Sequence, residues 1–242
     1  MSELTTLPDE MIDETRPRPQ TLTALYALDW EKILYVTFFV LAIISRFWNL
    51  GDRVVSHDES LHVQYSFQFY DGQGYTHTPL MHGPFLFHIT ALSYWLFGDN
   101  DFTARIPVAL FGVALILLPY FFRNWLGRTG ALVVSFLFLI SPYTVYYARY
   151  IRNEAFVVIW GLLIVWAIWL YIQKREEKYL WWFTAMNALL YSTKEVSFIY
   201  TAIFGSFLVI RLLAFLWRDG VIKEQFSRLA QPLALVGLGL AL

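Results

Sequence analysis

The chain has 242 residues, of which 57% are hydrophobic and only 15% are charged. Soluble globular domains average roughly 45–50% apolar and about 25% charged residues, so this composition argues against a single soluble domain and favours a membrane protein. The formal net charge of −1 gives no indication of a nucleic-acid partner. The chain has no cysteine, which excludes disulfides, thiol nucleophiles and cysteine-based metal sites.

The first 29 residues contain two basic residues among six acidic ones and no apolar run, so they do not resemble a cleavable signal peptide. Their composition predicts a disordered tail. The remainder, residues 30–242, is predicted to form a membrane module. We therefore expect two parts, a tail over 1–29 and a transmembrane part over 30–242.

A helix that crosses the hydrocarbon core needs about 20 predominantly apolar residues. The run Phe85 to Phe97 has 13 residues, with Pro84 before it and His88 within it, which favours a re-entrant or interfacial helix. The last apolar run, from Leu229 to Leu242, is short for a crossing, so we expect a chain that is truncated at its C-terminus. The predicted fold class is an all-α polytopic membrane protein with six or seven spans. The predicted spans are Ile33 to Trp48, Ile106 to Phe122, Thr129 to Tyr147, Ala155 to Ile172, Tyr179 to Thr193 and Val196 to Trp217, and a seventh starts near Leu229.

Basic residues orient these spans, because short cytoplasmic loops collect Lys and Arg. If 85–97 does not cross, 12 of the 18 basic residues fall before the first span, up to Lys32, and in the loops near 123–128, 173–178 and 211–228. This arrangement predicts a multi-pass protein of the plasma membrane with a cytoplasmic N-terminus. It places the loop 50–105 and the turns at 149–154 and 194–195 on the outer face.

The outer loop 50–105 carries most of the polar chemistry. All five histidines lie between His57 and His88. The adjacent acids Asp58 and Glu59 lie near the start of this loop. Carboxylates at a membrane rim are useful as general bases or metal ligands, because partial burial and neighbouring charge tune their proton affinity.

Several short motifs occur in an order that resembles one enzyme family. Arg46-Phe47-Trp48-Asn49-Leu50-Gly51 is followed by His57-Asp58-Glu59, His82-Gly83-Pro84-Phe85, Arg105-Ile106-Pro107, Ser141-Pro142 with Arg149, Arg152 and Glu154, and Thr193-Lys194. Together they resemble the dolichyl-phosphate-mannose protein mannosyltransferases and the related aminoarabinose transferases, which are membrane glycosyltransferases of the GT-C fold. Gly83 stands where the family has the first proline of a Pro-Pro pair, and Glu154 stands where many members have Asp. Family members are also much longer than this chain.

The resemblance implies transfer of a sugar from a polyprenyl-phosphate carrier, with inversion, to a protein, lipid or glycan acceptor at the outer membrane face. The acceptor hydroxyl must lose a proton as it attacks, and Asp58 is the first choice for this general base, with Glu59 and Glu154 as further catalytic acids. Guanidinium groups would stabilise the leaving phosphate. The candidate phosphate-binding residues are Arg149, Arg152, Lys194 and Arg105, and the candidate substrate contacts are His57, His82 and Tyr147.

Simpler interpretations stay open for these residues. Asp58 and Glu59 could belong to a solvated loop, Arg149 and Arg152 could anchor lipid headgroups, and Lys194 could only neutralise Glu195. The histidines could bind a divalent metal together with acidic residues. However, His57 and His62 are five residues apart and do not share one helical face, so no metal ligand set is assigned.

Two other functions compete with the glycosyltransferase. A noncatalytic membrane subunit of a larger complex would suit a short chain with an exposed apolar edge. A transporter would carry ionisable groups at membrane depth, but here the charges gather at the ends of the predicted spans. We therefore rank the transporter last.

Overall fold

A computed structural model describes residues 29–77 and 81–218, and the regular structure in these residues is entirely helical. The tail expected over 1–29, apart from Asp29, lies outside the described residues, and so does the seventh span expected from Leu229. The elements are α1 (Trp30–Phe47), α2 (His57–Tyr70), α3 (Phe85–Phe97), α4 (Asp101–Leu117), the 3₁₀ helix η3 (Leu118–Phe122), α5 (Arg123–Ile140), α6 (Pro142–Tyr147), α7 (Glu154–Lys174), α8 (Lys178–Tyr191) and α9 (Ser197–Arg218).

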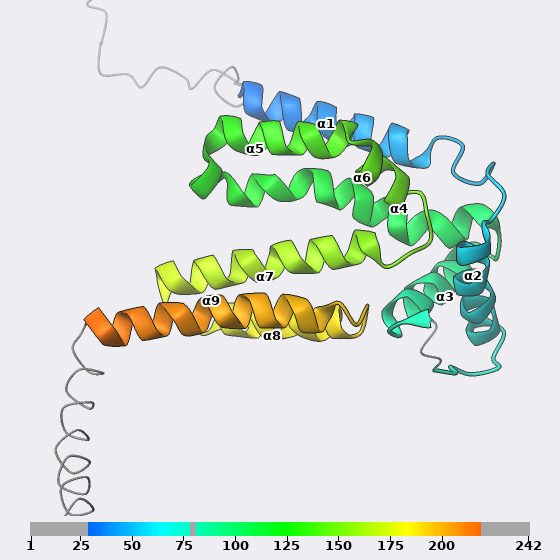
Figure 1. Ribbon diagram of the computed structural model, residues 1–242. Helices are drawn as coiled ribbons and strands as arrows, with labels where there is room; N and C mark the ends of the chain where they lie inside the picture. Colours follow the sequence, from blue (N-terminus) through cyan, green and yellow to red (C-terminus); the bar gives the residue numbers. More distant parts are fainter. Residues whose placement is uncertain (1–28, 78–80, 219–242) are drawn as a thin grey trace, which may run out of the picture.

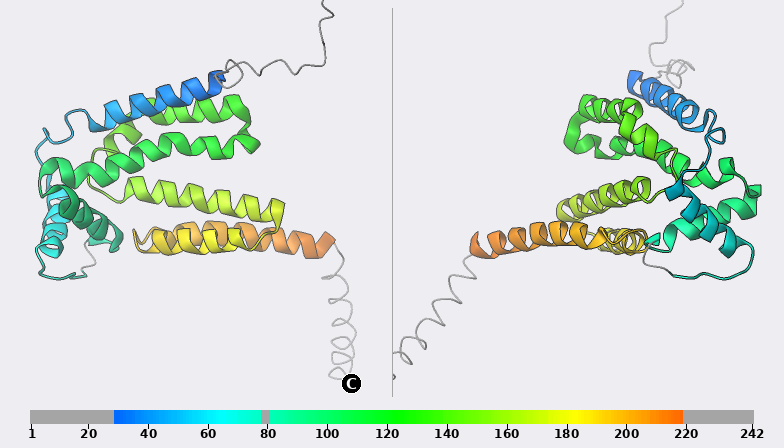
Figure 2. Two further views of the ribbon diagram at one scale, coloured as in Figure 1. Left: turned by 180° about the vertical axis from the view of Figure 1, so that it is seen from behind. Right: turned by 45° about the vertical axis from the view of Figure 1, so that its right-hand side comes forward.

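The long helices lie side by side in a bundle, and α2 and α3 lie across one end of it (Figures 1 and 2). Helix α4 contacts α1, α5 and α7, whereas α8 contacts α7 and α9. We call the end that carries α2 and α3 the α2–α3 end, and the opposite end, where α7 and α9 finish, the far end. The starts of α4, α7 and α9 and the last residues of α1 and α8 meet at the α2–α3 end (Figure 1).

Three helical segments are long and apolar enough to cross a membrane: Asp101–Ile140, Glu154–Lys174 and Ser197–Arg218. The first has 40 residues and contains α4, η3 and α5. Gly127 interrupts its helical backbone with φ 72° and ψ 164°, and α5 runs back alongside α4 (Figure 1). The six or seven predicted crossings are not confirmed, because α1 includes Glu31, Lys32 and Arg46 and α8 has only 14 residues.

One predicted span was wrong in its extent. The helix expected over Thr129 to Tyr147 is divided at Ser141 into α5 and α6, because Ser141 has φ −60° and ψ 122°. A residue before proline avoids the helical conformation, and Pro142 follows Ser141. By contrast, the short apolar helix expected over Phe85 to Phe97 has the bounds of α3, and it lies at the α2–α3 end rather than within the row of long helices (Figure 1).

Buried arginine and aromatic side chains hold the α2–α3 end together. Helix α5 ends before Pro142, so its last carbonyls lack helical partners. Arg46 of α1 is fully buried and donates to the carbonyls of Phe138 and Leu139, at 2.9 and 3.0 Å.

The ring centroid of Phe156 lies 4.6 Å from that of Phe111 and 5.2 Å from that of Phe85, both edge to face. These contacts fix α3, α4 and α7 relative to one another.

Candidate active site

Helix α2 begins with a capping box that orients the two adjacent acids. The Ser56 hydroxyl accepts a hydrogen bond from the Glu59 N–H, and the Glu59 carboxylate accepts one from the Ser56 N–H at 3.1 Å. Successive residues of a helix are about 100° apart around its axis. As a result, Glu59 faces the protein interior and is fully buried, whereas Asp58 is exposed.

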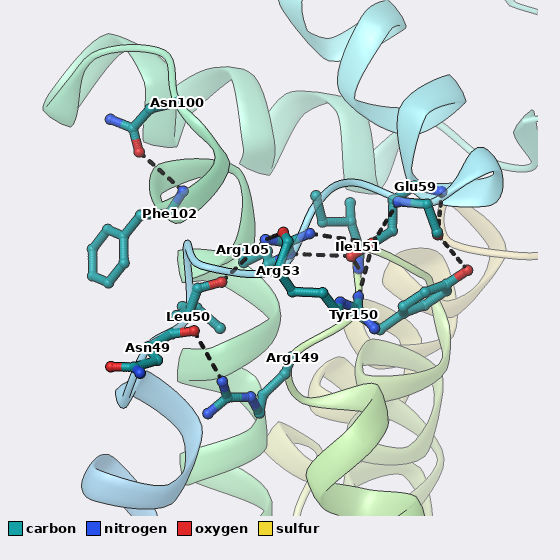
Figure 3. A network of polar contacts seen from close by, with 11 residues as sticks. Asn49, Leu50, Arg53, Glu59, Asn100, Phe102, Arg105, Arg149, Tyr150 and Ile151 are labelled. Carbon is teal, nitrogen blue, oxygen red and sulfur yellow. Dashed lines mark hydrogen bonds and ion pairs between the residues drawn. The ribbon is translucent and has the colours of Figure 1, made fainter.

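The Glu59 carboxylate receives five hydrogen bonds, and Figure 3 shows the network around it. Arg105 of α4 donates from Nε to Oε1 at 3.1 Å and from Nη2 to Oε2 at 3.3 Å. Arg53 donates to Oε2 at 2.8 Å, and the Ile151 N–H donates to Oε1 at 3.1 Å. The Ser56 N–H supplies the fifth bond. This single carboxylate therefore joins the segment after α1, the start of α2, helix α4 and the segment before α7.

Arg105 has no remaining group that faces solvent. Its Nη1 donates to the carbonyls of Leu50 and Arg53, at 3.1 and 2.9 Å, while its Nε and Nη2 bind Glu59. Burial acts to raise the pKa of Glu59, but the hydrogen bonds from Arg105, Ser56 and Ile151 outweigh it and lower the pKa below its ordinary value. The Glu59 carboxylate is therefore ionised at neutral pH, and its charge is satisfied inside the protein.

The second network is open to solvent and contains most of the other predicted residues. The Oδ2 of Asp58 lies 2.9 Å from Nη1 of Arg152. The Nε of Arg152 lies 3.5 Å from Oε2 of Glu154, and Oε1 of Glu154 lies 2.8 Å from Nζ of Lys194. More than half of the Asp58 side chain, 55%, is exposed. The four residues form an alternating row of charges from α2, from the start of α7 and from the turn between α8 and α9.

His82 joins the same region through the turn between α8 and α9. Its Nδ1 lies 2.7 Å from Oε2 of Glu195, and its backbone is left-handed, with φ 64°. Non-glycine residues in this conformation are uncommon, and histidine is among the more tolerant types. The pKa of Glu195 is lowered, because hydrogen bonds and the neighbouring His82 and Lys194 outweigh the effect of burial, which acts to raise it.

Gly83 explains the departure from the family's Pro-Pro pair. Its N–H donates to the Thr193 carbonyl at 3.2 Å, a bond that proline cannot make. A Cβ atom at this position would lie 2.2 Å from the Ser192 carbonyl oxygen. The glycine therefore permits the close approach that brings His82 to Glu195.

Arg149 lies beside a separate pocket of about 390 Å³, lined by Leu50, Arg53, Pro142, Val145, Tyr146 and Arg149. The guanidinium of Arg149 donates to the carbonyls of Ser45 and Asn49, at 2.9 and 3.1 Å. It makes no ion pair with a carboxylate of the described residues. Burial and the positive charges of Arg53 and Arg105 lower its pKa. This pocket offers two guanidinium groups and an apolar wall to an anionic ligand.

Tyr147 and His57 lie near these groups without a polar side-chain contact among the described residues. The Tyr147 ring packs on Tyr143, with centroids 4.5 Å apart, and on Tyr146 at 5.2 Å. His57 is exposed in the first turn of α2. The site thus contains an aromatic cluster beside Arg149 and one exposed imidazole next to Asp58.

The histidines do not gather around a common point. Among residues 29–77 and 81–218, no group of three or more histidine or acidic side chains is placed to hold a metal ion. His62 is buried, and its Nδ1 lacks a hydrogen-bond partner in this part of the chain. Burial, together with the positive charges of His82 and Arg152, lowers its pKa to about 4. A neutral, buried His62 therefore lies one helical turn after Asp58 in α2.

One residue of these networks, Arg53, was missed by sequence reasoning. Arg53 binds Glu59 and also lies over the Tyr150 ring, 5.0 Å from its centroid. Tyr150 accepts a hydrogen bond from the Ser56 hydroxyl at 2.9 Å. The spacing of Ser56 and Glu59 is that of a capping box, a pattern that predicts a glutamate turned back toward its own helix N-terminus. The sequence therefore already contained a pattern that predicts the orientation of Glu59.

Residues 81–240, more than half of the chain, match the family described as dolichyl-phosphate-mannose-protein mannosyltransferase. The chain belongs to this family. The family resemblance inferred from the ordered motifs is therefore confirmed. The match covers His82, Arg105, Arg149, Arg152, Glu154 and Lys194, whereas Asp58 and Glu59 precede it.

The chain is also similar to a Bacillus subtilis (strain 168) protein named "Putative mannosyltransferase YkcB". The two are 28% identical over 156 residues, which is 63% of this chain and 21% of that relative. The chain thus spans about a fifth of the length of the relative it matches. Family membership and apolar helices long enough to cross a membrane identify a membrane protein of the mannosyltransferase family.

Proposed function

We propose that this chain carries the general base and the donor-phosphate contacts of a membrane glycosyltransferase. The donor is a sugar on a polyprenyl phosphate, and the acceptor is a hydroxyl of a protein, lipid or glycan. The observation that carries the proposal is the 2.9 Å contact between Asp58 and Arg152. It puts an exposed carboxylate next to a guanidinium that belongs to the part of the chain matching the mannosyltransferase family.

In the proposed reaction, Asp58 accepts the proton of the acceptor hydroxyl as its oxygen attacks the anomeric carbon. A new carbon–oxygen bond forms on one face of the sugar, and the bond to the phosphate oxygen breaks on the other, which inverts the configuration. The electron pair of the broken bond stays with the phosphate, whose negative charge increases. Arg152, Arg149 and Lys194 stabilise that charge, because donors aimed at a charge that develops in the transition state accelerate the reaction.

Arg152 has a second role in this proposal. In the free site it donates a hydrogen bond to Asp58 at 2.9 Å, so this carboxylate oxygen is occupied. A donor phosphate competes for the same guanidinium, since arginine forms strong bidentate hydrogen bonds with phosphate. Donor binding therefore releases Asp58 when the sugar is in place.

Glu59, Arg105 and Glu154 take positioning roles instead of contacting the sugar. The first two bind each other in the interior and fix the start of α2. Glu154 holds Lys194 at 2.8 Å, so its charge orients the lysine toward the phosphate. His57, His82 and Tyr147 remain candidates for contacts with the sugar or the acceptor.

The proposed topology places the α2–α3 end on the outer face and the N-terminus in the cytoplasm of a cell with this protein in its plasma membrane. The support is the charge distribution, because basic residues favour the cytoplasmic side. Seven described basic residues lie in the segments that turn or finish at the far end: Arg123, Arg128, Lys174, Arg175, Lys178, Arg211 and Arg218.

The proposed function is tested with the full chain reconstituted in liposomes and supplied with labelled polyprenyl-phosphate mannose and mixed membrane acceptors. We expect transfer of label by the wild type and a loss of about 100-fold or more in an Arg149→Gln, Arg152→Gln double variant. The control removes two charges from the far end, Lys174→Gln with Lys178→Gln, and should retain transfer. Equal rates in both variants would contradict the phosphate contacts.

A noncatalytic membrane subunit is the second candidate. Helix α9 favours it, because Ser197 is the only buried residue of this apolar helix within the described structure. A partner protein could cover the exposed face. Absence of transfer by the wild type, together with stoichiometric copurification of another membrane protein, would support this candidate over the enzyme.

A further inference from the structure

A second charged pocket lies at the far end of the bundle, away from the candidate active site. It has a volume of about 710 Å³ and is lined by residues from the last turn of α7 and the second half of α9. Its lining contains no acidic residue. The residues that form it are Tyr171, Ile172, Arg175, Leu208, Arg211, Leu212, Ala214, Phe215 and Arg218.

Three guanidinium groups surround this pocket. Arg211 and Arg218 are seven residues apart on α9, so they lie on the same face of the helix two turns apart. Arg175 ends α7 in a left-handed conformation with φ 57°, and its N–H donates to the Tyr171 carbonyl at 2.9 Å. None of the three makes an ion pair with a carboxylate within residues 29–77 and 81–218.

Neighbouring lysines at the same end are arranged differently. Lys178 pairs with Glu176 at 2.5 Å, and both Lys178 and Lys174 lie over the Tyr179 ring, 5.1 and 5.7 Å from its centroid. Neither lysine lines the pocket. The positive charge that is available to a ligand is thus concentrated on the three pocket arginines.

The rest of the lining is apolar. Ile172 comes from α7, and Leu208, Leu212 and Phe215 follow one another at helical spacing on α9. A free phosphate ion would use only the guanidinium groups. A phospholipid would use both parts of the pocket, because arginine binds its phosphate and the apolar side chains contact its acyl chain.

We propose that this pocket binds an anionic phospholipid, with the phosphate at Arg175, Arg211 and Arg218 and an acyl chain along Ile172, Leu212 and Phe215. The site contains none of the residues placed in the transfer reaction. It lies at the opposite end of the helices, so it stands or fails independently of the proposed function. Bound lipid would link the ends of α7 and α9, which share few direct contacts.

The test uses the full chain, purified in a mild detergent and mixed with equal amounts of phosphatidylglycerol and phosphatidylcholine. Native mass spectrometry then counts the lipids that remain bound. We expect the wild type to retain phosphatidylglycerol about tenfold more than phosphatidylcholine. Both lipids carry a phosphate, but the choline cation of phosphatidylcholine is repelled by the three arginines. The Arg211→Gln, Arg218→Gln variant should lose most of this preference.

The Lys174→Gln, Lys178→Gln variant removes the same charge from the same end and should keep the preference. Equal retention of the two lipids by the wild type, or an equal loss in both variants, would overturn the proposal. A Leu212→Ser, Phe215→Ser variant tests the apolar wall and should also release the lipid. If excess inorganic phosphate displaces the lipid while this variant retains it, the pocket binds phosphate alone and the lipid assignment is wrong.

Discussion

Glu59 and Arg105 form an ion pair that is almost completely shielded from solvent, with Oε1 3.1 Å from Nε and neither side chain more than 1% exposed. The adjacent carboxylate, Asp58, contacts the partly exposed Arg152 instead. The first turn of α2 therefore separates two neighbouring acids into a structural one and an accessible one. This separation is the basis for assigning the proton transfer to Asp58 and not to Glu59.

Replacing Glu59 by alanine should destabilise the protein strongly. The change leaves Arg105 buried without a counter-charge, and breaking a buried pair by removing one partner costs about 3–5 kcal/mol. The measurement is the free energy of unfolding in detergent micelles. Asp58→Ala removes an exposed carboxylate and should change it by less than about 1 kcal/mol. Similar losses in the two variants would contradict the division between them.

The pH dependence of stability should carry a contribution from His62. Burial, with the charges of His82 and Arg152, lowers its pKa from 6.5 to about 4 in the folded protein. Between these values the unfolded chain binds a proton that the folded chain does not, so stability falls as the pH falls from 6.5 toward 4. From pH 6.5 to 5 the loss should be about 1.5 kcal/mol.

This contribution is measured by unfolding the wild type and a His62→Gln variant at both pH values. The variant should lose the pH dependence assigned to this residue. The exposed His88 provides the control, because His88→Gln should retain it. A slope that persists without His62 would assign the effect to other groups.

Gly83→Ala should weaken the contact between the start of α3 and the turn after α8. The new Cβ would lie 2.2 Å from the Ser192 carbonyl oxygen, which is a backbone atom that cannot rotate away. Overpacking of this kind costs typically about 1–3 kcal/mol. Thermal unfolding in detergent should show a lower midpoint. Gly205→Ala adds a methyl group within α9 where nothing lies within 4 Å, and it should not lower the midpoint.

Arg152→Gln should reduce kcat/KM for the polyprenyl-phosphate donor by about 100-fold, because the variant loses a charged donor to the leaving phosphate. Arg152→Lys keeps the charge but loses bidentate geometry, so an intermediate rate is expected. Steady-state transfer assays at varied donor concentration provide the measurement. An unchanged kcat/KM in the glutamine variant would remove Arg152 from phosphate binding.

Local patterns predicted the helices better than they predicted the roles of side chains. Pro84 and the length of the apolar run that follows it predicted the extent of the short helix at Phe85–Phe97, and α3 has these bounds. The same features should have indicated the break before Pro142, where the sequence instead favoured one span over Thr129 to Tyr147. The sequence placed a loop near 123–128 between two spans, and α5 does run back alongside α4 there. Periodicity could not reveal the backbone of Gly127, whose φ of 72° and ψ of 164° interrupt the helix.

The sequence predicted which residues belong to the candidate site but not which of them pair with one another. Ordered motifs brought together Asp58, Arg152, Glu154 and Lys194, which the structure joins in one row of charges. The sequence ranked Asp58 first as the general base but also placed Glu59 among the catalytic acids, since two adjacent acids differ only through the helix they enter. Arg53 was missed, because its pairing with Glu59 requires the fold to bring the chain back across the start of α2.

The most direct test of the account is the rate of sugar transfer by Asp58→Asn compared with Asp71→Asn in the full chain. Both changes remove one exposed carboxylate from α2 or its C-cap, but only Asp58 contacts Arg152. We predict that Asp58→Asn lowers kcat at least about 100-fold with retained folding and donor binding, because the proton acceptor is lost. Asp71→Asn should transfer at the wild-type rate. Wild-type transfer by Asp58→Asn would contradict the assignment of Asp58 as the general base.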